Sequence, residues 1–259
     1  MGSIGTRHAK NLASLGHTVD DVKRYCSLNH ALDTKPDMVL ICSPTSEHKY
    51  QLETVLDRSI PTFIEKPLFD GLSNINGILA KSKDIVTMVG CNLRFNEDVG
   101  NIKRLADSTY LFRAHYGGYL PVWRQGDYRK SYSAKKSMGG GIHLDAIHEI
   151  DYLSWIFGEI ESIKNIKHNT HKLEIDSDDV SVSSVKFKSG VMGIISLTYL
   201  QRIPSRFCEL FGDKNYMIDI EVTNNDYLKE MKYFVDCVAH KVQPMNNVVE
   251  AYKTLMKWI

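Results

Sequence analysis

The first ninety residues alternate short, continuous apolar runs with segments of helical spacing. Apolar side chains lie three or four positions apart in the helical segments and next to one another in the runs. The continuous apolar run at 37–42 and the short strands predicted at 61–67 and 85–89 alternate with predicted helices at 5–15, 46–58 and 72–80. Strands without polar alternation, separated by helices, are typical of a parallel sheet covered on both faces. We therefore predict an α/β domain with a parallel sheet.

The pattern changes near Asn92, where longer strands begin. Several of these strands are separated only by turn residues, which indicates a mostly antiparallel, open sheet in an α+β domain. The predicted strands lie at 110–115, 160–168, 180–187, 191–200, 206–211 and 216–220, and the helices at 142–157, 226–239 and 247–259. We place one boundary near 92–95, which gives two domains, 1–92 and 93–259.

Composition narrows the class of ligand. Among the 259 residues, 32 Lys and Arg balance 31 Asp and Glu, so the net charge of +1 creates no field that would attract nucleic acid or an anionic membrane. The five cysteines are widely spaced and never form a CxxC pair, which argues against a disulfide framework or a zinc site. The sequence shows no basic-then-apolar leader and no long apolar run, so we expect a cytoplasmic protein that acts on a small molecule.

Glycines and polar residues follow each strand of the predicted parallel sheet. Ligands of such sheets bind outside the carboxyl ends of the strands. Gly2 and Gly5 open the first helix, where the backbone can approach a pyrophosphate and the exposed N–H groups favour an anion. A G-x-x-G segment alone is more often a plain turn, so this signal is weak by itself.

A Glu-Lys-Pro segment at 65–67 follows the second predicted strand. A lysine at the ligand edge can donate a proton or a hydrogen bond to an alcohol or carbonyl oxygen. The alternative is a surface lysine before a turn. A cis bond before Pro67 would turn Lys66 inward, and the sequence permits but does not require it.

Three glycines at 139–141 precede a predicted helix that contains Asp145 and His148. The glycines would let the backbone approach a ligand closely. Asp145 and His148, three residues apart, would lie on one helix face, where the carboxylate could set the tautomer of a general acid or base. The alternative is a structural histidine beside an apolar stripe. A zinc hydrolase using His143 and His148 is disfavoured, because residues five apart fall on different helix faces.

These stretches occur in one order that resembles the Gfo/Idh/MocA (glucose–fructose oxidoreductase, inositol dehydrogenase, MocA) family. The resemblance rests on GSIGTRHAKNL, KPDMVLICSPTSEH, PTFIEKPL, VGCNLRF, YLPVWRQGDYRKSYSAKKSMGGGIHLDAIHEIDYLSWIFG and NDYLKEMKYFVDCV. It implies a Rossmann domain that binds NAD or NADP, and a second domain whose open sheet forms the substrate floor and often an oligomer interface. The long fifth stretch is also similar to members from surface-polysaccharide and nucleotide-sugar pathways.

The resemblance implies roles for individual residues. Lys66 matches the lysine that contacts the reacting oxygen, His148 matches the acid/base histidine, and Asp145 is a less direct match beside it. The candidates for cofactor binding are Gly2, Ser3, Ile4, Gly5, Arg7, His8, Asp20, Ser43, Pro44, Thr45, His48, Glu65, Lys66 and Asn92. The candidates for substrate binding are Arg94, Tyr119, Trp123, Arg124, Tyr128, Arg129, Tyr132, Asp145 and His148.

The implied reaction moves a hydride between a nicotinamide and the hydroxyl or carbonyl carbon of a sugar or nucleotide sugar, in a homo-dimer or tetramer joined through the second sheet. Relatives carry a strand and one more glycine before the first helix, so the resemblance implies that the first Rossmann strand is absent here. Residues 17–20 barely make a second strand. Asp20 or Asp21 would favour NAD by bonding the ribose 2′-OH, although Asp20 lies only fifteen positions after Gly5 where about 20 is usual. The alternative is a sugar-binding or subunit-interaction protein that has lost cofactor binding.

Overall fold

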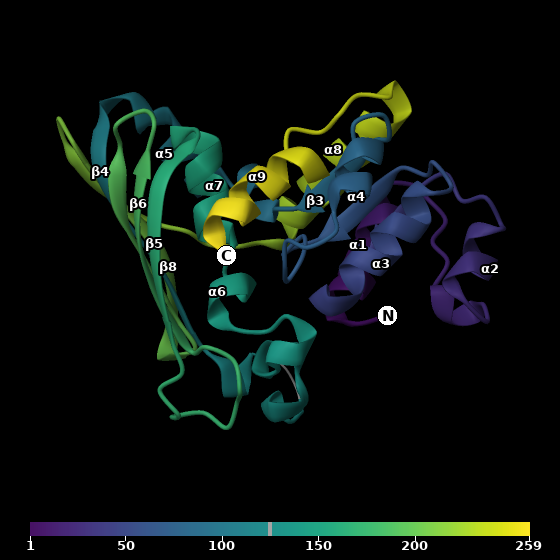
Figure 1. The fold of residues 1–259 in the computed structure, drawn as a ribbon. Helices are drawn as coiled ribbons and strands as arrows, with labels where there is room; N and C mark the ends of the chain where they lie inside the picture. The colour runs from purple at the N-terminus through teal and green to yellow at the C-terminus, as the bar shows by residue number, and fades with distance from the viewer. Residues whose placement is uncertain (124–125) are drawn as a thin grey trace. The chain divides into compact units, whose positions relative to one another are not determined.

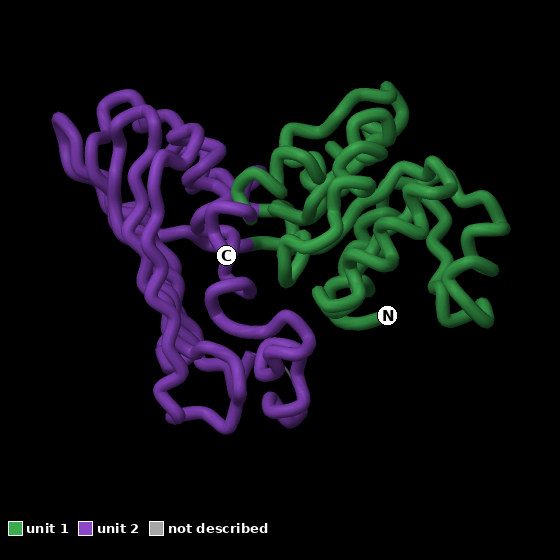
Figure 2. The backbone as a smooth tube through the Cα atoms, in the orientation of Figure 1, with its two compact units in different colours: residues 1–92, 223–255 green, residues 93–222, 256–259 purple. Residues whose placement is uncertain are grey.

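The structure, a computed structural model, describes residues 1–123 and 126–259 and divides into two compact units (Figure 2). Unit 1 contains residues 1–92 and 223–255, and unit 2 contains residues 93–222 and 256–259. The segment 223–255 therefore differs from the prediction of one domain over 93–259. It packs within unit 1, where the Val89 N–H donates to the Asn246 carbonyl at 2.9 Å.

Unit 1 contains a parallel sheet with the order β1-β2-β3 (Figure 1). Its strands are β1 (Val39–Ile41), β2 (Thr62–Glu65) and β3 (Thr87–Gly90). Its helices are α1 (Ser3–Ser14), α2 (Leu28–Leu32), α3 (Thr45–Leu56), α4 (Asn76–Lys81), α8 (Asn224–His240) and most of α9 (Val248–Trp258). The parallel pairing confirms the predicted α/β class for this part of the chain.

Strand β2 lies in the middle of this sheet and is buried along its whole length. Phe63 has no exposed surface, and its ring contacts Phe234 of α8 with centroids 5.6 Å apart. Ile64, which points to the other face, is equally buried, and α3 contacts the same strand. Burial on both faces explains why the sequence of this strand shows no polar alternation.

Unit 2 contains a mixed, mostly antiparallel sheet with the order β5-β6-β7-β4-β8-β9, in which only the β4–β7 pair among the described residues is parallel. Its strands are β4 (Thr109–Tyr119), β5 (Ile160–His168), β6 (Val180–Phe187), β7 (Met192–Thr198), β8 (Leu200–Gly212) and β9 (Asn215–Asp219). Its helices are α5 (Glu97–Arg104), α6 (Ile142–Asp145), α7 (His148–Phe157) and the end of α9. The predicted open sheet is confirmed.

One face of this sheet forms the core of unit 2. Phe112 of β4 stacks on Phe157 of α7 with ring centroids 5.7 Å apart, and Phe187 of β6 packs against both rings. Buried and exposed positions alternate along β6. This period of two explains why the strand could be predicted with its observed ends.

Two predictions differ from the structure in more than the ends of an element. The helix expected over 142–157 is two helices, because the backbone at Ala146 leaves the helical region with ψ 34° between α6 and α7. The second strand expected at 17–20 does not form, and the His17 N–H instead closes the end of α1 by donating to the Leu12 carbonyl at 3.0 Å. Over the described residues, no helix has both the length and the apolar character needed to cross a membrane.

Candidate active site

The carboxyl ends of the three parallel strands in unit 1 gather most of the predicted cofactor residues. Ser43, Pro44 and Thr45 connect β1 to α3; Glu65 ends β2 and Lys66 follows it; and Asn92 follows β3. Because parallel strands end at the same edge of a sheet, these groups share one edge of unit 1. The structure thus brings together residues that lie far apart in the sequence.

Helix α1 begins at this edge with an uncapped N-terminus. Gly2 precedes the helix in extended conformation, no side chain caps it, and its first turn carries no acidic residue. A Cβ atom on Gly5 would lie 3.4 Å from the Cβ of Cys42, an ordinary contact distance, so the helix packs against the end of β1 at this residue. Free N–H groups and the positive end of a twelve-residue helix suit an anion. The residues at 2–5 therefore fit the pyrophosphate of a dinucleotide.

Two other predicted cofactor residues are Arg7, which lies in α1, and Asp20, which lies after it. The exposed Arg7 places its guanidinium over the ring of Tyr227, 4.4 Å from the centroid, which holds the cation close to the start of the helix. Asp20 is exposed and pairs with Arg24 in an irregular segment. This carboxylate lies on no strand, so the spacing argument that favoured NAD through Asp20 loses its structural basis.

His8 lies inside unit 1, which corrects its assignment as a cofactor contact. Its side chain has no exposed surface, and Nε2 lies 2.6 Å from Oε1 of the buried Glu65. The ring also packs edge-on against Phe63 and Tyr227. His8 and Glu65 thus bind each other.

His48 is also buried, and it connects the segments that follow β1 and β2. Nδ1 lies 2.9 Å from the Pro67 carbonyl and Nε2 lies 3.1 Å from the Ser43 carbonyl. Burial lowers the pKa of His48 despite these carbonyl contacts, so the ring is neutral at pH 7. Its observed contacts are with backbone, which corrects its assignment as a residue that reaches the cofactor.

Lys66 is partly exposed at the same edge, and its peptide bond to Pro67 is cis, as the sequence permits. Its backbone N–H faces Oε2 of Glu65 at 3.3 Å. The lysine that the resemblance assigns to catalysis therefore directly follows a buried carboxylate.

In unit 2, the three glycines at 139–141 pack against the protein itself. A Cβ on Gly140 would lie 2.1 Å from the Tyr132 carbonyl oxygen, and one on Gly141 would lie 2.5 Å from Oδ1 of Asp178. Gly139 and Gly141 also have φ of 77° and 118°, where a side chain is strained. Close backbone at Gly140, the Asp178 side chain at Gly141 and the positive φ at Gly139 and Gly141 account for these glycines without a ligand.

Asp145 ends α6 and is held by three hydroxyl groups. Its carboxylate accepts hydrogen bonds from Tyr132, from Ser133 at 2.6 Å and from Tyr199 at 2.6 Å. Burial, followed by the Asp145 charge, raises the pKa of Tyr199 well above its usual value, so this phenol stays protonated and donates. No sequence pattern marks Ser133 or Tyr199 as partners of Asp145.

His148 is the first residue of α7, beyond the break after α6. Asp145 and His148 therefore do not share a continuous helix, which corrects the expected helical spacing. The next acidic residues of α7 form buried ion pairs: Glu149 accepts from Arg206 at 2.7 Å, and Asp151 accepts from Arg94 at 2.8 and 2.7 Å. Arg94, predicted to bind substrate, thus has its charge matched inside unit 2.

The remaining substrate candidates lie at the end of β4 and on the segment after it. Trp123 packs edge-on against Tyr199 with ring centroids 5.0 Å apart, and the Tyr119 ring lies under the Arg202 guanidinium. The Tyr128 hydroxyl accepts from the Glu174 N–H at 3.2 Å. Arg129 pairs with Asp127 and Glu174 and is exposed. Arg124 lies outside the described residues.

His143 has both ring nitrogens engaged within unit 2. Nδ1 lies 2.9 Å from Ser181 Oγ and Nε2 lies 2.9 Å from the Trp258 carbonyl, while the ring stacks on the Trp258 indole at 4.1 Å. Within the ranges 1–123 and 126–259, no group of three potential metal ligands occurs.

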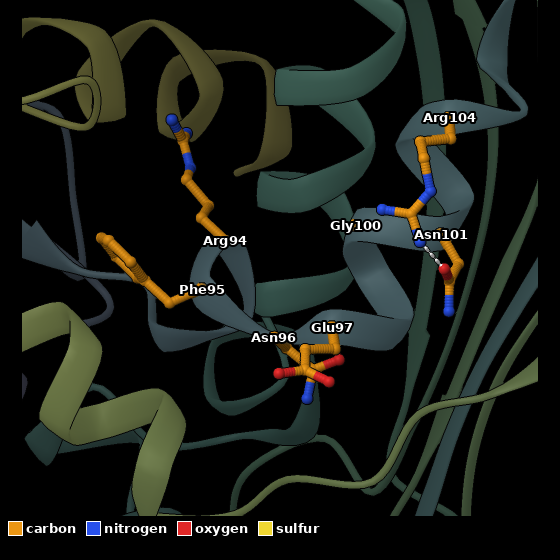
Figure 3. Close-up of a pocket in the computed structure, with 7 residues that line it drawn as sticks. All are labelled: Arg94, Phe95, Asn96, Glu97, Gly100, Asn101 and Arg104. Carbon is orange, nitrogen blue, oxygen red and sulfur yellow. Dashed lines mark hydrogen bonds between the residues drawn. The ribbon is translucent and has the colours of Figure 1, made fainter.

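A pocket of about 480 Å³ lies in unit 2 beside α5 (Figure 3). Its lining comes from the turn at 92–95 and the helix: Arg94, Phe95, Asn96, Glu97, Gly100, Asn101 and Arg104. Arg104 donates to Asn101, and the charge of Arg94 is matched by Asp151. Apart from Arg94, no lining residue was predicted as a site.

The sequence matches two family descriptions. Residues 2–91 match "Oxidoreductase family, NAD-binding Rossmann fold", and residues 108–218 match "GFO/IDH/MocA C-terminal domain". The chain belongs to the Gfo/Idh/MocA family. The predicted family and fold are confirmed, and the family description of residues 2–91 agrees with the predicted NAD cofactor.

Individual known proteins are similar to this chain over most of its length. Scyllo-inositol 2-dehydrogenase (NAD(+)) of Bacillus subtilis is 26% identical over 221 residues, which cover 74% of this chain and 64% of that protein. The structure of GenD2 from gentamicin A biosynthesis, in complex with NAD, has a TM-score of 0.86 at 16% identity and covers 99% of this chain and 89% of that one. The WlbA dehydrogenase of Bordetella pertussis, in complex with NADH and UDP-GlcNAcA, has a TM-score of 0.74 at 17% identity, with 88% and 77% covered.

Proposed function

We propose that this chain is an NAD(P)-dependent oxidoreductase that transfers a hydride between a nicotinamide and the hydroxyl or carbonyl carbon of a sugar or nucleotide sugar. The observation that carries the proposal is the edge of unit 1 at which the parallel strands end. The uncapped N-terminus of α1 lies at this edge, where Gly5 packs against the end of β1. Lys66 lies at the same edge, directly after β2. Membership of an oxidoreductase family supports the same chemistry.

In this proposal the cofactor, when bound, accepts or donates the hydride. The N–H groups at 2–5 hold its pyrophosphate, and Lys66 donates a hydrogen bond to the reacting oxygen. His148 moves the proton of the sugar hydroxyl. Asp145 acts on the substrate side, with its carboxylate fixed by the Tyr132, Ser133 and Tyr199 hydroxyls.

A sugar-like substrate is supported by similar proteins and by the residues after β4. The Bacillus subtilis relative is a dehydrogenase of an inositol, and the Bordetella pertussis structure contains a nucleotide sugar. Tyr119, Trp123 and Tyr132 present aromatic surface that can stack on a sugar or a base, and Arg129 can bind carboxylate or phosphate.

We also propose that a second copy of the chain covers the outer face of the unit 2 sheet. Adjacent strands place apolar side chains on this face: Ile166, Val182, Met192, Ile194 and Met217, between 40% and 62% exposed. Arg113 pairs with Glu209 in the same face. A row of exposed apolar residues across several strands is typical of a homo-oligomer interface.

Titration with NADH and NADPH, followed by nicotinamide fluorescence, tests the enzyme proposal directly. We expect saturable binding, and the Lys66→Met variant should retain this binding while turnover of the sugar falls by roughly 100-fold or more. Failure of the parent chain to bind either cofactor would instead favour the non-catalytic sugar-binding alternative. Unchanged turnover in Lys66→Met would remove this lysine from the mechanism.

A further inference from the structure

The buried contact between His8 and Glu65 joins two parts of unit 1 that the proposed function uses separately. His8 belongs to α1, whose N-terminus fits the pyrophosphate, and Glu65 is the last residue of β2, directly before Lys66. The 2.6 Å contact spans 57 positions of the sequence. No other polar contact between α1 and β2 is observed among the described residues.

The surroundings of Glu65 keep this contact dry and fix its geometry. The His8 side chain is fully buried, and that of Glu65 is 10% exposed. A Cβ on Gly90 would lie 3.2 Å from Glu65 Oε1, so glycine at the end of β3 leaves the room that this carboxylate occupies. Charge-assisted hydrogen bonds with little water nearby are short and directional.

The charge of Glu65 is also felt by its neighbours. Burial raises the pKa of the Cys42 thiol above its usual range, and the charges of Glu65 and Glu230 raise it further. Burial and then the Glu65 charge raise the pKa of Tyr227 in the same direction. Cys42 and Tyr227 therefore remain neutral beside Glu65, and the side-chain hydrogen bond observed at Glu65 Oε1 is the one with His8.

We propose that His8 and Glu65 are a positioning pair that sets the place of Lys66 relative to the N-terminus of α1. The pair touches neither substrate nor cofactor. It holds the last residue of β2 through Oε1, while Oε2 faces the Lys66 N–H at 3.3 Å, so the lysine backbone is tied to the phosphate-binding helix. The effect on turnover rests on the proposed function, whereas the effect on the backbone does not.

The test uses His8→Phe, which keeps a ring against Phe63 but removes the hydrogen bond. At saturating cofactor and substrate, kcat should fall roughly 100-fold, because a misplacement of about 1 Å is sufficient for such a loss. KM for the sugar and NADH affinity should change by less than about threefold. His8→Gln, whose amide donates near the Nε2 position, should recover most of kcat.

Asn11→Leu is the matched control. Asn11 is a buried polar residue on the same helix that contacts Asn224 rather than Glu65. Its variant should lose stability with kcat retained. If His8→Phe does not fold, Glu65→Gln replaces it; the amide keeps a weaker, uncharged contact, and kcat should fall roughly 10-fold.

Amide hydrogen exchange on the chain without cofactor separates this inference from the proposed function. A peptide covering 62–68 should exchange faster in His8→Phe than in the parent, while peptides from the unit 2 sheet stay unchanged. Unchanged exchange at 62–68, or a folded His8→Phe with the kcat of the parent, would overturn the positioning role. An inactive parent would refute the enzyme proposal and leave the exchange result to decide this one.

Discussion

His143 gives unit 2 a sensitivity to acid that can be measured. The ring stacks on Trp258 with an interplanar angle of 3°, and Nε2 donates to the Trp258 carbonyl while Nδ1 faces the Ser181 hydroxyl. A neutral imidazole satisfies both contacts, because its Nε2–H donates to the carbonyl while its unprotonated Nδ1 accepts from the Ser181 hydroxyl. Burial lowers the pKa of His143 from 6.5 to about 4, and the charge of Lys167 acts in the same direction.

The sign and size of the effect follow from this pKa. In the unfolded chain His143 gains a proton near pH 6.5, whereas in the folded chain it does so only near pH 4. The contribution to stability is therefore complete above pH 6.5 and is lost as the pH falls toward 4. At 1.36 kcal/mol per pH unit, the loss is about 3 kcal/mol.

Urea unfolding followed by tryptophan fluorescence measures this loss, because all three tryptophans lie in unit 2. The variant is His143→Gln, which keeps a donor for the Trp258 carbonyl but cannot titrate. The parent should be more stable at pH 7, and its advantage should shrink by about 3 kcal/mol by pH 4. Burial raises the pKa of the neighbouring Asp178, which acts with the opposite sign. Since Asp178 is present in both proteins, it cancels in the comparison, and an advantage that stays constant with pH would refute the reasoning.

Three further predictions concern packing, charge and assembly. Gly140→Ala should destabilise unit 2 by about 1–3 kcal/mol, because the new Cβ meets three backbone carbonyls. Thermal unfolding measures this loss. The control is Gly77→Ala, in open space on α4, which should cause no loss of stability. Asp151→Asn should cost about 3–5 kcal/mol, because it removes the carboxylate charge that matches the buried Arg94. The exposed Asp236→Asn should cost less than about 1 kcal/mol, and equal losses in urea unfolding would contradict this. Ile194→Asp should convert an oligomer to a monomer in sedimentation, and a monomeric parent would refute the interface.

The parts of the fold that were predictable are those whose pattern follows from local burial. β2 shows no polar alternation because both of its faces are covered, and β6 alternates because only one face is. Gly190, with φ of 93°, marks the turn between β6 and β7. In each case the residues that determine the element lie within it.

The rest depends on contacts between residues far apart in the chain. The periodicity of 226–239 predicts a helix, but it does not indicate that Phe234 packs on Phe63 in unit 1. The break between α6 and α7 was missed because Ala146 and Ile147 are ordinary helix residues. Asp145 binds Tyr199, which lies 54 positions later and has no pattern to mark it.

The two glycine-rich stretches show that a ligand-binding role can be assigned to a motif only after its structural contacts are known. Gly5 and Gly140 both lie in candidate ligand motifs. Gly5 faces Cys42 at ordinary contact distance, and the helix above it begins with free N–H groups. Gly140 faces backbone carbonyls of its own unit, so its lack of a side chain is already explained without a ligand. Only the first motif keeps a feature that a ligand would satisfy.

Each proposed catalytic residue directly adjoins a buried acidic residue that is bound to a distant base. Lys66 follows Glu65, which His8 binds from α1, and His148 precedes Glu149, which Arg206 binds from β8. Breaking a buried pair of this kind leaves a charge without compensation, so the backbone beside it has little freedom to move. Sequence motifs mark the residues that meet the substrate, but the partners that hold their backbone come from other elements. Changes at these partners should therefore alter turnover although they touch no substrate.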